Sequence, residues 1–107
     1  MKIYISGKIT GLSLVVAEMN FEKVEKIILD LGHEPINPMK IIPYDPKLTW
    51  EDYMIGDIKA LFECQAIFMQ ENWAESKGAR IERSIAFEMG LIIKHLPLNK
   101  GFYNEFN

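Results

Sequence analysis

The chain has 107 residues, of which 49% are hydrophobic and 25% are charged, a balance typical of one globular domain with a packed core. Its net charge is −3 without a basic run, which disfavours binding to the phosphate backbone of nucleic acids, and no apolar stretch reaches the roughly 20 residues of a membrane span. A lone cysteine argues against a disulfide framework and is compatible with a reducing compartment. We therefore expect a single cytoplasmic domain over residues 1–107, with no nucleic-acid or membrane partner.

The first third of the chain predicts a strand, a helix and a second strand. Residues 2–6 are apolar and rich in β-formers, and the glycine-bearing loop SGKITG follows them. Ser13 can cap a helix whose apolar positions recur at helical spacing until Gly32, a good C-terminal cap. Residues 34–37 form a short strand, and the prolines in and after it favour an edge position in a sheet.

The rest of the chain continues the alternation of helices and strands. Residues 39–48 predict a loop, after which Thr49 and Asp52 form a capping box at the start of a helix that runs to about Phe62. The elements that follow are a buried strand over 66–69, a loop over 70–77, a helix over about 78–89 and a strand over 91–94.

This order predicts an α/β fold, a flavodoxin-like or Rossmann-like three-layer sandwich with a parallel sheet of four to five strands. Ligands of such sheets bind beyond the carboxyl ends of the strands, near the point where the strand order reverses. Three predicted loops meet at that edge, over residues 6–12, 38–48 and 70–77. We expect the binding site between them.

Glu82 is the carboxylate that the pattern singles out. It shares a helical stripe with Gly78 and apolar residues, and a partly buried carboxylate needs a partner or a purpose. The nearby helix N-terminus favours its charged form, which suits nucleophilic attack on a sugar carbon. The alternative is a structural ion pair with Arg80 or Arg83, and the pattern alone favours that alternative.

Asp57 and Ser76 are two further candidates. Asp57 falls on the apolar stripe of the preceding helix beside Gly56, which leaves room for close approach. It is either a second carboxylate for glycosidic-bond chemistry or a side chain at the margin of the stripe. Ser76 lies where the third helix begins, and its hydroxyl with the free N–H groups of residues 77–79 suits a phosphate. An ordinary N-cap serine is the commoner case.

Four aromatic residues fall near the expected ligand edge, and each either stacks on a nucleobase or belongs to the core or rim: Tyr4, Tyr44, Trp50 and Trp73. His33 follows a helix cap and Cys64 precedes a buried strand, so we interpret both as structural. No Cys/His cluster has the spacing of a zinc site, and we expect neither a metal nor an organic cofactor.

Four segments in this order resemble the nucleoside 2-deoxyribosyltransferase-like superfamily: KIYISGKITG, GHEPINP, WEDYMIGDIKAL and SKGARIE. The similarity covers residues 2–93 and points to a branch of small, functionally unassigned bacterial and phage proteins. It implies N-glycosidic bond cleavage or transfer on a (deoxy)nucleoside 5′-monophosphate.

The resemblance also implies roles for individual residues. Glu82, four positions after a glycine, matches the catalytic nucleophile, and Asp57 matches a catalytic aspartate that assists the base or sugar. Glu88 in the run FEMG lacks that upstream glycine and is the second choice for the nucleophile. The substrate-binding residues that it implies are Tyr4, Ser6, Gly7, Lys8, Ser76, Lys77 and Gly78, with Ser76 contacting the 5′-phosphate.

One residue of the first loop departs from the family pattern. Lys8 replaces the proline of the related S-G-P loops, and it either adds a phosphate contact or disturbs the loop. The alternative function is a non-catalytic nucleotide-binding or sensing module with the same pocket, and a third is a small structural or interaction domain.

The last eleven residues, 97–107, have no clear period but carry the aromatic side chains Phe102, Tyr103 and Phe106. Exposed aromatic patches are typical of subunit interfaces. Related enzymes are homo-oligomers whose sites borrow residues from a neighbour. We therefore expect a homodimer or homotetramer in which Tyr103 or Asn104 reaches the partner's pocket.

Overall fold

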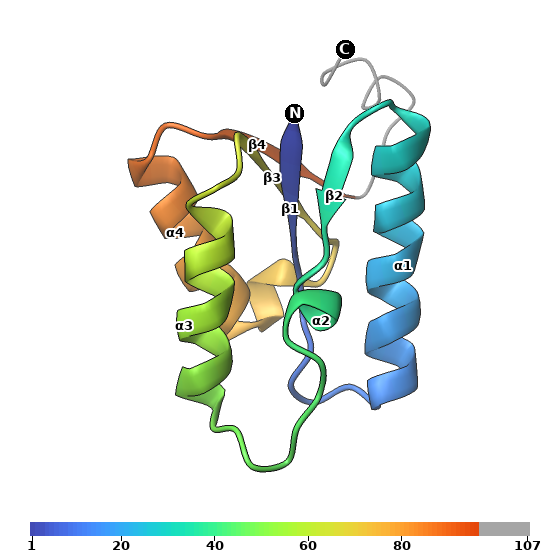
Figure 1. Cartoon of the computed structure of the whole chain (residues 1–107), viewed down its shortest axis with the longest axis vertical. Helices are drawn as coiled ribbons and strands as arrows, with labels where there is room; N and C mark the ends of the chain where they lie inside the picture. Colours follow the sequence, from blue (N-terminus) through green and yellow to red (C-terminus); the bar gives the residue numbers. More distant parts are fainter. Residues whose placement is uncertain (97–107) are drawn as a thin grey trace.

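The structure, a computed structural model, describes residues 1–96. Its sheet is parallel, with the strand order β2-β1-β3-β4. The strands are β1 (Lys2–Ser6), β2 (Glu34–Ile36), β3 (Ala66–Met69) and β4 (Ile92–His95). Helix α1 (Leu14–Asp30) covers one face, and α3 (Trp50–Leu61) and α4 (Lys77–Glu88) cover the other (Figure 1). The predicted three-layer α/β sandwich is therefore confirmed, with four strands in residues 1–96. The subunit contact predicted for residues 97–107 lies outside the described residues.

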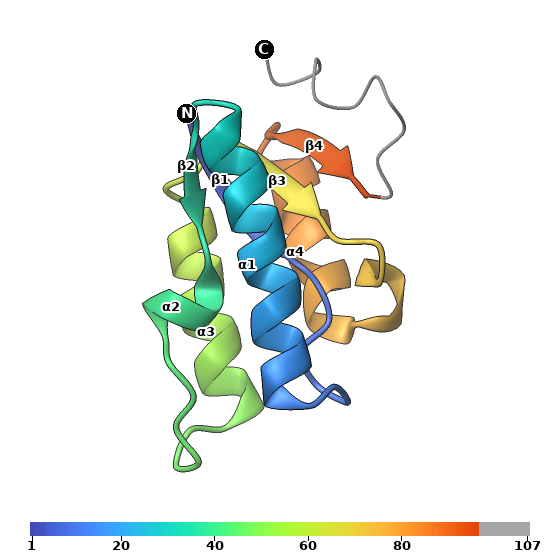
Figure 2. The same cartoon turned by 90° about the vertical axis from the view of Figure 1, so that its right-hand side faces the viewer.

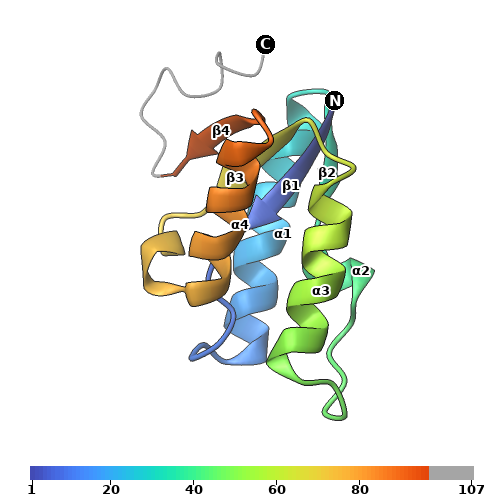
Figure 3. The same cartoon turned by 90° about the vertical axis from the view of Figure 1, so that its left-hand side faces the viewer.

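Strand β1 separates two apolar layers, because successive side chains of a strand point to opposite faces of the sheet. Ile3 and Ile5 are fully buried against Phe21 and its neighbours on α1, the helix that lies in front of the sheet in Figure 2. Tyr4 belongs to the apolar layer on the opposite face, the face covered by α3 and α4, which lie in front of the sheet in Figure 3. Ser6, two residues further on, shares that face with Tyr4, and this alternation directs both hydroxyl groups towards α4.

The helix starts that the sequence predicts are present. The Ser13 hydroxyl accepts a hydrogen bond from the Val16 amide, 3.2 Å away, at the start of α1. Thr49 and Asp52 form the complete capping box of α3, with bonds of 2.9 and 3.1 Å in the two directions. Strand β2, which contains Pro35 and is followed by Pro38, is at the sheet edge, as predicted.

Two segments predicted as loops contain short helices. Residues Pro38–Ile41 form α2, which begins with the Asn37 side chain accepting from the Met39 amide at 3.0 Å and with a proline at the first position. The turn η1 (Trp73–Glu75) is a 3-10 helix. One helical turn is too short to show an apolar period, so only the Asn-Pro start signal could have indicated α2.

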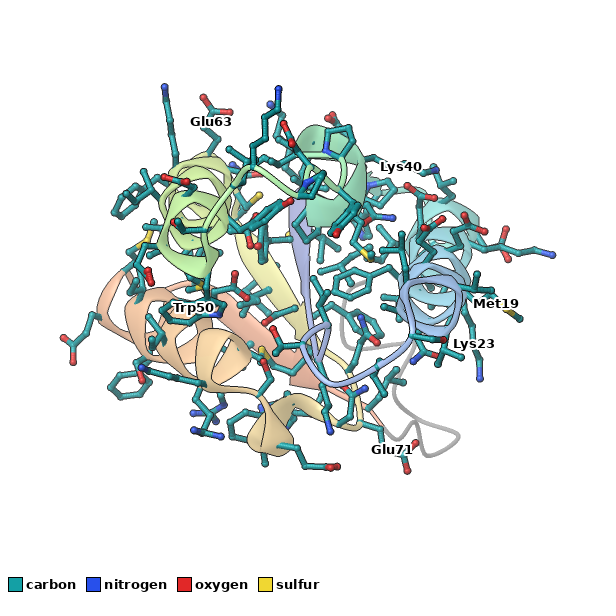
Figure 4. The ribbon with its side chains drawn as sticks, turned by 90° about the horizontal axis from the view of Figure 1, so that it is seen from below. Met19, Lys23, Lys40, Trp50, Glu63 and Glu71 are labelled. Atoms are coloured by element: carbon teal, nitrogen blue, oxygen red, sulfur yellow. The ribbon has the colours of Figure 1, made fainter. Side chains whose placement is uncertain are left out.

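The strand order reverses between β1 and β3. The chain reaches β2 through α1 on one face of the sheet and β3 through α3 on the other, so the crossovers diverge at the carboxyl ends of β1 and β3. Figure 4 looks onto this edge, where the first turns of α1, α3 and α4 also lie. Within residues 1–96, every helix is too short or too polar to cross a membrane.

Candidate active site

A cavity of about 390 Å³ lies at this edge of the sheet, between the end of β1, the first loop, the α2 segment, α3 and the start of α4. Its walls are largely aliphatic and aromatic. The lining side chains that can donate or accept a hydrogen bond are Tyr4, Thr10, Tyr44, Trp50, Tyr53, Asp57, Ser76 and Glu82. A largely apolar cavity with few convergent polar groups is typical of a small-molecule site.

Glu82 is held in this cavity by two hydroxyl groups from the central strand. Its side chain is only 5% exposed. The Tyr4 hydroxyl donates to Oε2 at 2.8 Å, and the Ser6 hydroxyl donates to Oε1 at 2.7 Å. Because the two donors lie two residues apart on β1, they approach the carboxyl group from one face of the sheet. We call this arrangement of Tyr4, Ser6 and Glu82 the carboxylate clamp.

The interpretation of Glu82 as a structural ion pair is wrong. Arg80 instead donates through Nη1 to the Ala74 carbonyl at 2.7 Å, and Arg83 donates through Nε to His95 Nε2 at 3.2 Å. No ion pair of Glu82 occurs within residues 1–96. The buried carboxyl is therefore oriented by neutral donors and left without a cation.

Burial dominates the electrostatics of Glu82. Burial raises its pKa to about 8, the charge of Asp57 also raises it, and the hydrogen bonds from Ser6 and Tyr4 lower it. The helix N-terminus was expected to favour the charged form, but that effect is about 0.3–1 kcal/mol, less than one pKa unit. It is too small to offset loss of water around the carboxylate. Burial likewise raises the pKa of Tyr4 well above its usual value, so this hydroxyl keeps its proton and donates.

Asp57 is the second carboxyl group of the cavity. It is 9% exposed, and burial raises its pKa to about 7. Its carboxyl group has no hydrogen-bond partner within residues 1–96. The charge of Asp57 raises the pKa of Glu82, so ionisation of Asp57 disfavours ionisation of Glu82. A buried, unpartnered carboxyl facing a cavity indicates a group reserved for a ligand.

The start of α4 combines a helix cap with the cavity wall. The Ser76 hydroxyl accepts from the Ala79 amide at 3.1 Å, which is the ordinary N-cap bond, and the same side chain lines the cavity. Gly78 also lines the cavity, and a Cβ there would lie 3.0 Å from the Met54 sulfur of α3. The glycine therefore allows α4 to begin close against α3.

The two lysines predicted to bind substrate do not line the cavity. Lys77 lies over the ring of Trp50, with Nζ 4.9 Å from the ring centroid. Trp50 lines the cavity and lies between α3 and α4 in Figure 4. The Lys8 ammonium is 3.5 Å from the Glu75 carboxylate. Both lysines are thus next to the site and engaged by protein groups.

The cavity is not lined by Trp73, Glu88 or Cys64. Trp73 packs against the Arg83 guanidinium, 5.0 Å from the ring centroid, and against His95, and it does not line the cavity. Glu88, the second choice for the nucleophile, is exposed near the end of α4. Cys64 is buried, and burial raises the pKa of its thiol to about 11.

Sequence reasoning missed Tyr53 and the wall that it supports. The cavity-facing residues of α3 are Trp50, Tyr53, Met54 and Asp57, with the spacing i, i+3, i+4, i+7. This helical spacing is the feature of the sequence that could have identified Tyr53. The Gly56 position was expected to admit a ligand, but the Ile42 side chain fills the space that its Cβ would take. Within residues 1–96, no group of three or more His, Cys, Asp or Glu side chains could hold a metal ion.

Fold and site together define a small parallel α/β domain with two buried carboxyl groups in a cavity at the strand-order reversal. Residues 1–95 match the family described as a domain of unknown function, DUF4406, and the chain belongs to that family. No curated protein matches the sequence.

Among solved structures, the chain is similar to a 2-deoxyribosyltransferase from the psychrotolerant bacterium Bacillus psychrosaccharolyticus. The TM-score is 0.67 at 16% sequence identity, over 99% of this chain and 90% of that chain. The two proteins share a fold over their length. This agrees with the fold that the resemblance implies, whereas the roles of individual residues stay predictions.

Proposed function

We propose that this protein cleaves or transfers the N-glycosidic bond of a (deoxy)nucleoside 5′-monophosphate, with Glu82 as the nucleophile and Asp57 as the proton donor. The observation that carries the proposal is the carboxylate clamp, which faces a cavity shared with a second, unpartnered carboxyl. A purely structural carboxylate at this depth would normally be paired with a cation. The shared fold with a 2-deoxyribosyltransferase supports the same reaction class.

The reaction proceeds in two displacements at C1′ of the sugar. A Glu82 carboxylate oxygen forms a bond to C1′ while the bond from C1′ to the base nitrogen breaks, and the electron pair leaves with the base. The Asp57 carboxyl gives its proton to the departing base, which leaves neutral. Water or a second base, deprotonated by Asp57, then attacks C1′ and releases the Glu82 carboxylate.

The first displacement needs one proton on the carboxyl pair, with Glu82 ionised and Asp57 protonated. Burial raises the pKa of Glu82 to about 8 and that of Asp57 to about 7, so the pair by itself keeps a single proton on Glu82. A base nitrogen that accepts a hydrogen bond from Asp57 would favour the protonated form of that carboxyl. The proton would then lie on Asp57, and the hydroxyl groups of Tyr4 and Ser6 would stabilise the Glu82 carboxylate.

The start of α4 supports a phosphorylated substrate. The hydroxyl of Ser76 uses an oxygen lone pair in its cap bond and keeps its proton free to donate to a phosphate. The N–H groups of the first turn of a helix point outwards and favour an anion. Lys77 adds positive charge nearby, whereas the charge of Lys8 is paired with that of Glu75.

Substitutions of Ser76 should separate phosphate binding from helix capping. Ser76→Ala should raise KM for a nucleoside monophosphate by roughly tenfold, the effect of about one charge-assisted hydrogen bond. Ser76→Asp is the matched control, because aspartate caps helices as well as serine does but repels a phosphate. The Ser76→Asp variant should keep the wild-type melting temperature. It should lose turnover of nucleoside monophosphates and keep turnover of free nucleosides. Equal turnover of both substrate types by wild type and Ser76→Asp would contradict the phosphate assignment.

A panel of ribo- and deoxyribonucleoside 5′-monophosphates, with the matching free nucleosides, tests the proposed function. Incubation followed by chromatography should show free base from at least one monophosphate, and base exchange when a second base is added. Binding without any base release would instead favour the nucleotide-binding or sensing module. Absence of both binding and release would exclude the proposal.

We further propose that residues 1–107 act as one domain that assembles into a homodimer or homotetramer. Large apolar side chains are exposed on both helical layers. They are Val15 and Met19 on α1, Ile55 on α3, Phe62 at the C-cap of α3 and Phe87 on α4. Figure 4 shows Met19 pointing away from the sheet. Such residues are typical of subunit interfaces. Light scattering at micromolar concentration should give a mass at least twice that of the chain, and a fully active monomer would contradict this.

A further inference from the structure

We propose that Tyr44 is the platform on which the nucleobase stacks, and that Tyr53 is a positioning residue that holds this platform over the cavity through Asp45. The inference rests on the proposed function and deepens it, because it assigns recognition of the base to one face of the cavity. It starts from the segment between α2 and α3, residues 42–49, which the structure fixes to α3 at two points.

The first fixed point is the Tyr53 hydroxyl. It accepts a hydrogen bond from the Asp45 amide at 2.7 Å and donates one to the Asp45 carbonyl at 2.8 Å. One side chain of α3 thereby satisfies both backbone groups of a single loop residue. The hydroxyl is part-buried, so loss of either bond would leave a backbone group poorly satisfied.

Asp45 also organises the loop around itself. Its Oδ1 accepts from the Lys47 amide at 2.9 Å, and its carbonyl accepts from the Leu48 amide at 3.1 Å. These bonds close a turn just after Tyr44 and leave Asp45 fully engaged. The direction of the Tyr44 side chain is therefore tied to the Tyr53 hydroxyl through one residue.

The second fixed point lies one turn further along α3. The Ile42 side chain occupies the space that a Cβ on Gly56 would take, and Ile42 itself lines the cavity. Positions 53 and 56 are three residues apart and therefore share a face of the helix. The start and the middle of the segment are thus both docked onto α3.

Tyr44 has the position and the freedom that a stacking residue needs. It lines the cavity, yet 66% of its surface is exposed in the absence of a ligand. Trp50 is the other lining aromatic residue near the mouth, but one face of its ring is covered by Lys77. An aromatic ring over a planar base raises affinity by about fivefold to 150-fold in stacking sites of other proteins.

The neighbouring wall favours stacking over hydrogen bonding. Met39 and Ile42 are apolar, and the Tyr53 hydroxyl is already used by Asp45. This side of the cavity therefore offers a base few free donors or acceptors, and a flat apolar contact is the interaction that it can supply. In this arrangement the carboxyl pair acts on the glycosidic bond, and Tyr44 contacts the face of the base.

The experiment is a double-mutant cycle with Tyr44→Ala and Tyr53→Phe on the nucleoside monophosphate that wild type cleaves. Each single variant should raise KM about fivefold or more while kcat stays within about twofold, because the nucleophile is untouched. The double variant should be no worse than the worse single variant, since both changes remove the same platform. Tyr44→Phe is the matched control and should keep wild-type KM, because it keeps the ring.

Hydrogen exchange at the Asp45 amide gives a readout independent of turnover. Tyr53→Phe should accelerate this exchange at least about tenfold and leave β1 amides unchanged. Unchanged exchange, independent effects that multiply in the double variant, or a fall in kcat with constant KM would each overturn the inference. If wild type neither binds nor cleaves any nucleotide, the proposed function fails, and the assignment of Tyr44 to a nucleobase fails with it. Accelerated exchange would in that case still show that Tyr53 holds the loop.

Discussion

Glu82→Gln should reduce base release by a factor of at least about 10³ while the protein stays folded, since an amide cannot form and release the glycosyl bond. Glutamine matches glutamate in shape, and its carbonyl oxygen can still accept from Ser6. The variant should therefore keep the cavity and bind the nucleoside monophosphate. Chromatography of released base, with thermal unfolding and ligand binding measured on the same sample, checks the three parts separately.

Glu88→Gln provides the matched control for this experiment. It makes the same chemical change on the same helix, at an exposed position near its C-terminal end. Turnover of this variant should stay within about twofold of wild type. Substantial turnover by Glu82→Gln, or a loss confined to Glu88→Gln, would refute the assignment of the nucleophile.

Glu82→Gln should also raise the free energy of unfolding at high pH. The stabilisation by this substitution near pH 9 should exceed its effect near pH 5 by roughly 2–4 kcal/mol. Burial raises the pKa of Glu82 from 4.5 to about 8, so the folded state binds the proton more tightly than the unfolded state does. The free energy of unfolding of wild type therefore falls as pH rises from about 4.5, and the loss is complete above about 8. Glutamine has no proton to lose and avoids this penalty.

Urea unfolding of wild type and variant at several values between pH 5 and pH 9 measures the difference. The advantage of Glu82→Gln should grow from pH 5 to about pH 8 and then level off. Asp57→Asn should behave likewise between about pH 4 and pH 7, because burial raises the pKa of Asp57 to about 7. Glu88→Gln, at an exposed site, should give a difference that is nearly constant with pH. A constant difference for Glu82→Gln would show that this carboxyl is not destabilised by burial.

Many of the helices and strands could be predicted because the local sequence signals agree with the fold. The apolar run of β1, the serine cap of α1 and the capping box of α3 each report on a few neighbouring residues, and each is present in the structure. The alternation of strands and helices then leaves few topologies to consider. The start of α2 carried only an Asn-Pro signal, so the segment was predicted as a loop.

The site was harder to predict because its contacts join residues that are far apart in the sequence. The stripe on α4 indicated that Glu82 was buried, but its partners are 76 and 78 residues away on β1. Side-chain alternation placed Tyr4 and Ser6 on one face of a strand, and only the sheet order shows that α4 covers that face. The pairing of Tyr53 with Asp45 depends on how an irregular loop folds back, which no period in the sequence encodes.

The carboxylate clamp is built on a buried central strand, whereas the wall at residues 42–49 is built on a surface segment. A change to the clamp disturbs the centre of the molecule, and a change to the wall disturbs its periphery. Under the proposed function, reactivity and substrate choice are therefore encoded in separate parts of the chain. A library randomised only at positions 42–44 should change which base the cavity accepts and leave the surroundings of Glu82 unchanged, which makes this fold a practical starting point for directed evolution.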